Sequence, residues 1–184
     1  MPGNWAALKN IRWSKGFPAA GTGAKILNCR AYYLAKERCA DVKGAYRRYQ
    51  EYLHDNQQQF PPRAFALGTA EWRQGGNDHR SPHDAWLESL IISEPASGER
   101  SEQRVAVLRV RLLAAYHDGF IELFYPRVFS YSFGAENSER GTGDWVYDEF
   151  RRSPGGHVIH EIEWSGGTRW MIEASDIEYQ WLPK

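Results

Sequence analysis

The chain has 184 residues, of which 42% are hydrophobic, 14% aromatic and 25% charged. This length and composition are typical of one globular domain with a hydrophobic core. No apolar run approaches the roughly 20 residues of a transmembrane helix, and residues 1–30 lack the apolar stretch of a secretory signal, so we expect a cytoplasmic protein. Cys29 and Cys39 are the only cysteines, which excludes a disulfide framework and a four-cysteine zinc site; we expect both thiols to be reduced.

The formal charge is zero but unevenly distributed along the chain. Residues 1–63 contain 11 Lys/Arg and 4 Asp/Glu (+7), residues 64–143 contain 8 and 11 (−3), and residues 144–184 contain 4 and 8 (−4). A basic N-terminal third could contact nucleic acid, and an acidic C-terminal part could face a basic partner. The alternative is that the two parts neutralise each other in the folded protein.

The N-terminal third divides into an arm and a helical part. Residues 1–30 lack periodicity and contain several Gly and Pro residues, which predicts a loosely structured arm. Apolar residues at helical offsets predict an amphipathic helix over about 39–57, ended by an Asn/Gln run. Pro61 and Pro62 then predict the start of a second short helix. Residues 31–184 are expected to form one domain, with a helical part over 31–72.

The β part extends over residues 83–184. Short runs of β-forming residues predict strands at 86–92, 105–113, 120–125, 128–133, 144–150, 157–164, 168–174 and 177–181, with residues 94–103 as an exposed hairpin tip. The predicted fold class is therefore α+β: an N-terminal helical segment packed on an antiparallel sheet or sandwich of about seven or eight strands.

The last hairpin allows a prediction of register. Val158, His160, Ile162 and Trp164 share one face of the first strand, and Trp170, Ile172 and Ala174 share the apolar face of the next. Cross-strand partners share a face, so Ile162 should pair with Trp170 or Ile172. This pairing requires a loop of three or five residues around Ser165-Gly166-Gly167, with glycine supplying a positive φ.

Histidines and carboxylates at three places in the chain are candidates for chemistry. His83 and Asp84 lie side by side before the first strand; their structural interpretation is a turn, and the functional one is a site. His160 lies on an apolar row and should be buried and hydrogen-bonded, whereas His157 points to the opposite face. Carboxylates near 144–149 and 173–178 could converge with His83 or His160 into an acid and base cluster.

No common catalytic signature is present: the chain has no G-x-S-x-G, Walker loop or H-E-x-x-H. We therefore expect no cofactor and no metal site. The stretch Lys43 to Tyr49 interleaves cations with tyrosines, which is compatible with nucleic-acid binding, but its tyrosines are expected to pack inward.

The order of motifs resembles a family of uncharacterised small bacterial proteins, a domain of unknown function. The matching segments are AYYLAKE, the helix AYRRYQEYL, the HD pair, AVLRVRLL, FIELFYPRV, DWVYDEF and HVIHEIEWSGGTRWMIEASDI. The resemblance covers about residues 31–181 and is most specific at His83-Asp84, at Trp145, Tyr147 and Glu149, and at Asp176-Ile177. It implies neither enzyme activity nor a cofactor, and such proteins are similar to immunity proteins that neutralise bacterial toxins.

The leading hypothesis is a non-enzymatic protein-binding module, an immunity-type inhibitor whose partner is a cognate toxin. Its predicted partner-binding residues are Asp144, Trp145, Tyr147, Asp148 and Glu149. A hydrolase or ligand-binding enzyme that uses His83, Asp84 and His160 is the first alternative. A nucleic-acid binder that uses the basic helix is the second and the less favoured one.

Overall fold

The computed structural model describes residues 33–34, 38, 40–74, 77–134 and 141–184. The predictions of a loose arm over residues 1–30 and of reduced thiols at Cys29 and Cys39 lie outside these residues. Within the described part, no helix is both long enough and apolar enough to cross a membrane.

The helical part comes first and follows the sequence pattern closely. It consists of α1 (Val42–Asp55), the 3-10 turn η2 (Gln57–Gln59), α2 (Pro62–Gly68) and the 3-10 turn η3 (Glu71–Gln74). The Asp41 side chain accepts a hydrogen bond from the Gly44 amide (2.8 Å) and so caps α1. Ala45, Tyr49 and Leu53, at intervals of four residues, form its buried face.

A distant residue caps the second helix. Pro62 occupies the first turn of α2, where its missing N–H has no helical partner to lose. The carboxylate of Asp176 accepts a hydrogen bond from the Ala64 amide (2.9 Å). This contact holds α2 against the connection between the last two strands.

Two four-stranded antiparallel sheets form most of the remaining structure, which confirms the predicted α+β class. The first sheet has the order β1-β4-β5-β10, the second sheet has the order β6-β9-β8-β7, and β2 pairs with β3 in a small hairpin. The strands are β1 (Trp86–Ser93), β2 (Ala96–Ser97), β3 (Gln103–Arg104), β4 (Val107–Leu113), β5 (Gly119–Tyr125), β6 (Val128–Phe133), β7 (Trp145–Arg152), β8 (Val158–Trp164), β9 (Arg169–Ala174) and β10 (Glu178–Pro183).

The inner faces of both sheets and the helices share one hydrophobic core. The first sheet contributes residues such as Leu108, Leu112 and Ile121, and the second contributes Phe150 and Ile172, all with exposed fractions of 0%. The predicted final hairpin is confirmed in detail. Ile162 pairs with Trp170, and the loop has three residues, with Gly167 at φ +83°.

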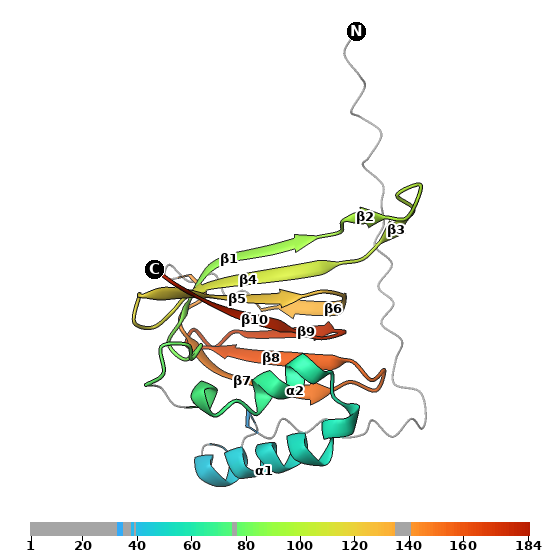
Figure 1. Cartoon of the computed structure of the whole chain (residues 1–184). Helices are drawn as coiled ribbons and strands as arrows, with labels where there is room; N and C mark the ends of the chain where they lie inside the picture. Colours follow the sequence, from blue (N-terminus) through green and yellow to red (C-terminus); the bar gives the residue numbers. More distant parts are fainter. Residues whose placement is uncertain (1–32, 35–37, 39, 75–76, 135–140) are drawn as a thin grey trace, which may run out of the picture.

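Helix α1 covers the free edge of the second sheet. In Figure 1 it lies beside β7, on the opposite side of the molecule from β1. The Tyr49 hydroxyl accepts a hydrogen bond from the Phe150 amide (2.7 Å), and the Tyr52 hydroxyl accepts one from the Arg152 amide (2.9 Å). Two N–H groups of an edge strand are thereby satisfied by the helix.

Replacing Tyr49 with Phe should leave the buried Phe150 amide without an acceptor. We expect Tyr49→Phe to lower the free energy of unfolding by about 1–3 kcal/mol in urea denaturation. Tyr131→Phe is the matched control, because Tyr131 is 49% exposed, and it should change the free energy of unfolding little. Equal stabilities of the two variants would contradict this role of α1.

Candidate functional site

The two segments that the sequence singled out meet in the structure. The Asp84 amide donates to the Trp145 carbonyl (2.8 Å), the Trp145 amide donates to the Ala85 carbonyl (2.9 Å), and Trp86 forms a β-bridge with Asp144. We call residues 83–86 and 144–147 the β1–β7 junction. It joins the beginning of the first sheet to the beginning of β7 across about 60 residues of sequence.

His83 and Asp84 form a turn, as the structural interpretation predicts. The Ala85 amide donates to the Pro82 carbonyl (3.0 Å), and the Ser81 hydroxyl, rather than Asp84, accepts from the His83 amide (3.3 Å). Asp84 has φ 61°, a left-handed conformation that Asp adopts more readily than most residues. The His83 ring meets the Tyr147 ring edge to face at 6.3 Å, so the turn is seated on β7.

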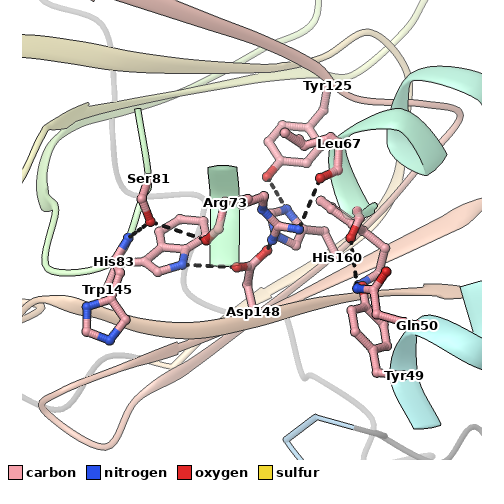
Figure 2. A network of polar contacts seen from close by, with 12 residues as sticks. Tyr49, Gln50, Leu67, Arg73, Ser81, His83, Tyr125, Trp145, Asp148 and His160 are labelled. Carbon is pink, nitrogen blue, oxygen red and sulfur yellow. Dashed lines mark hydrogen bonds and ion pairs between the residues drawn. The ribbon is translucent and has the colours of Figure 1, made fainter. Parts of the chain in front are cut away.

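Beneath the junction lies a buried polar network centred on Asp148 (Figure 2). Its Oδ2 atom lies 2.7 Å from Nε2 of His160 and forms an ion pair with Arg73. Its Oδ1 atom accepts from the indole N–H of Trp145 at 3.2 Å. The other ring nitrogen of His160, Nδ1, lies 2.7 Å from the hydroxyl of Tyr125. The chain of contacts therefore runs from η3 through the second sheet to β5 of the first sheet.

The geometry assigns the protons in this network. Because a carboxylate only accepts, Nε2 of His160 carries the proton and Nδ1 accepts from Tyr125. Burial holds the pKa of His160 well below its usual value, and the nearby Arg73 charge acts in the same direction, so the imidazole is neutral. The ring is 1% exposed and both of its nitrogens are occupied. His160 is thus the buried, hydrogen-bonded histidine that its position on the apolar row predicts.

The buried guanidinium of Arg73 contacts several different groups. Burial lowers its pKa, but a guanidinium keeps its charge in proteins. Its charge faces Asp148, its plane lies over the Phe150 ring at 4.7 Å, and Nη1 donates to the Leu67 carbonyl at 3.5 Å. Arg73 fastens the helical part to β7.

The predicted partner-binding set divides into surface and buried members. Asp144 and Tyr147 are partly exposed, whereas Trp145 is 1% exposed, Glu149 0%, and the Asp148 side chain 8%. A partner can contact only Asp144 and Tyr147 of the five in this conformation. The buried members face either the core or the segment before α1, because both faces of β7 are covered. The alternation of aromatic and acidic residues in the sequence does not reveal this covering.

Glu149 lies on the outer face of the second sheet, away from the Asp148 network. Its Oε2 accepts hydrogen bonds from the amides of Tyr33 (2.9 Å) and Leu34 (3.1 Å), and its Oε1 lies 3.1 Å from Nε of Arg151. Burial raises the pKa of Glu149 to about 7, against the opposing effect of these partners. This carboxyl anchors the chain that enters α1.

The structure brings His83 and Asp148 to one small hollow but keeps His160 behind it. The hollow has a volume of about 50 Å³, enough for a water molecule but not for a substrate. Its lining residues are Tyr33, Arg73, Pro82, His83, Trp145, Val146, Tyr147 and Asp148. Among the described residues, no group of three His, Cys, Asp or Glu side chains is placed to hold a metal ion.

Sequence reasoning missed Arg73 and Tyr125 as members of the network. Arg73 occupies a polar stretch that reads as a loop, and Tyr125 ends an ordinary strand. Neither has a local signal, because each acquires its role from a contact made across the fold.

Comparisons with protein-family models, with curated proteins and with solved structures find no match. The interpretation of the site therefore depends on its geometry.

Removing the charge of Asp148 should lower the stability of the folded protein. We expect Asp148→Asn to lower the free energy of unfolding by about 3–5 kcal/mol, because Arg73 is then buried without a counter-charge. Chemical denaturation measures the effect, with the partly exposed Asp144→Asn as control, for which a small change is expected. A small effect at position 148 would mean that the network is solvated.

Glu149 should make stability depend on pH. Its pKa is raised from 4.5 to about 7 in the folded protein, so its contribution is fully present below pH 4.5 and decreases as the pH rises towards 7. The loss is on the order of 3 kcal/mol at 1.4 kcal/mol per pKa unit.

Glu149→Gln, which cannot ionise, should lack this loss. Unfolding of both proteins at about pH 5 and about pH 8 measures the difference, and the comparison cancels the contribution of His160. A stability difference between the two proteins that stays constant with pH would show that Glu149 titrates normally.

Proposed function

We propose that this protein is a non-enzymatic protein-binding module, an immunity-type inhibitor that acts in the cytoplasm on a bacterial toxin. Its contact surface is the exposed part of the β1–β7 junction. The observation that supports this best is the backbone pairing of the His83-Asp84 turn with Asp144 and Trp145. This pairing gathers acidic and aromatic side chains from two distant segments at one place.

The exposed side chains there are of the kind that protein interfaces use. The Asp84 side chain is 67% exposed, the His83 side chain 45%, and Trp86 48%. Aromatic residues at interfaces supply much of the binding energy, and charged residues guide association. The buried Asp148 network under this surface restricts its motion, which lowers the entropic cost of binding.

The charge of the domain favours a basic partner. Residues 33–184 contain 18 Lys/Arg and 23 Asp/Glu, a net charge of −5. Long-range attraction from an acidic domain speeds association with a basic protein and weakens with salt. A toxin that acts on nucleic acid has such a basic surface.

The two alternatives have less support. An enzyme that uses His160 would need a free ring nitrogen, and both are bonded in the core. In α1, Arg47 and Arg48 lie near Glu51 and Asp41, which reduces the positive field available to nucleic acid. Tyr49 is buried, as expected, and is not available for stacking on bases.

The test is binding to the protein encoded by the neighbouring gene, measured as protection of growth on co-expression and as association kinetics with purified proteins. Removing both surface carboxylates of the junction, with Asp84→Asn and Asp144→Asn together, should lower the association rate about tenfold at low salt. The reduction should shrink as salt is added.

The matched control is the pair Asp55→Asn and Glu71→Gln, two exposed carboxylates outside the junction. The double variant with these two substitutions should protect cells from the toxin as well as the natural sequence does. Failure of the unmodified protein to bind the neighbouring product, or equal loss in both double variants, would count against the proposal.

A further inference from the structure

The outer face of the first sheet has an ordered arrangement of charge. Leu108, Val110 and Leu112 point into the core, so the alternate residues of β4 point outward, and the same alternation holds along β5. The strand register places the outward residues in rows that cross the sheet. One row is Ile91, Arg109, Phe124 and Glu178; the next is Ser89, Arg111, Glu122 and Gln180; a third contains Leu113, Phe120 and Leu182.

Of the charged residues in these rows, the cations lie on β4 and the acidic residues on β5 and β10. Arg109 and Arg111 are both on β4, whereas Glu122 is on β5 and Glu178 on β10. Arg109 lies over the Phe124 ring at 4.2 Å, and among the described residues no carboxylate forms an ion pair with it. Arg111 is paired with both Glu88 (2.5 Å) and Glu122.

We propose that this face binds a second copy of the chain. In the proposed dimer a two-fold axis runs parallel to the strands, between β4 and β5. Each row of one copy then lies against the same row of the other copy, in the opposite order. Arg111 of each copy then faces Glu122 of the other, Arg109 faces the Phe124 ring, and Leu113 faces Phe120. Sheets that pack face to face in this aligned way are common, and a two-fold interface needs such a self-complementary surface.

The charges also exclude the other face-to-face arrangement. A two-fold axis across the strands would bring β4 against β4 and β5 against β5. With the axis at the second row, Arg111 would face Arg111 and Glu122 would face Glu122; with the axis between the first two rows, Arg111 would face Arg109. Both positions bring like charges together, which is repulsive. The alternation of charge between β4 and β5 thus selects one axis.

The first two rows line a hollow of about 380 Å³. Ile91, on the rim, is 53% exposed. A face of four strands is about 19 Å wide at 4.8 Å per strand. An interface four strands wide is at the small end of the range of buried areas for specific protein–protein interfaces. We therefore expect a dissociation constant on the order of micromolar.

The test measures the mass of the full chain in solution by sedimentation over a range of concentrations. The natural sequence should change from one to two chains per particle as its concentration rises. Arg111→Glu places carboxylates against Glu122 of the partner, and Glu122→Arg places cations against Arg111, so each variant alone should remain monomeric. An equimolar mixture of the two variants should form dimers again, because opposite charges then face each other at both contacts.

Arg127→Glu is the control, since Arg127 is outside the first sheet and lies over Phe129 at 5.6 Å; it should dimerise normally. Circular dichroism of each variant checks the fold, and recovery in the mixture shows that neither variant has lost its structure. A natural sequence that stays monomeric, single variants that still dimerise, or a mixture that stays monomeric would each overturn the proposal.

Discussion

The carboxylate of Asp148 is the contact on which the rest of the structure depends. It is 8% exposed and faces the guanidinium of Arg73, the imidazole of His160 and the indole of Trp145. A buried charge is tolerated only when it is paired and fully hydrogen-bonded. Because Arg73 comes from the helical part and His160 leads on to Tyr125 of β5, satisfying this one group aligns the helices and both sheets (Figure 2).

This arrangement buries the residues that a catalytic site would most readily use and leaves a different set of polar and aromatic residues exposed. Arg73, Asp148 and His160, the residues with the strongest chemical character, lie in the interior and contact one another. Asp84, Asp144 and Trp86 remain at the surface of the junction, where the proposed partner would bind. The proposed partner surface and the proposed dimer face use different charged residues, so variants can separate the two.

Local patterns predicted the elements well because their causes are local. The four-residue spacing of Ala45, Tyr49 and Leu53 specifies the buried face of α1, and the alternation along β8 and β9 specifies the pairing of Ile162 with Trp170. The candidate site was predicted in part. His160 was expected in the core and His83 in a turn, but Trp145, Asp148 and Glu149 were expected to contact a partner. Their burial could not be predicted, because the covering of both faces of β7 depends on chain segments far away in sequence.

The sequence by itself determined the class of the fold, the positions of the strands in its two large sheets and the register of its last hairpin, since these follow from hydrophobic period and turn chemistry over a few residues. Only the tertiary structure decided which polar residues meet. The pairing of Asp84 with Trp145, the ion pair of Arg73 with Asp148 and the hydrogen bond of Tyr125 with His160 join residues between 35 and 75 positions apart. No short-range pattern encodes such contacts, because they form only when the two sheets and the helices close around one core.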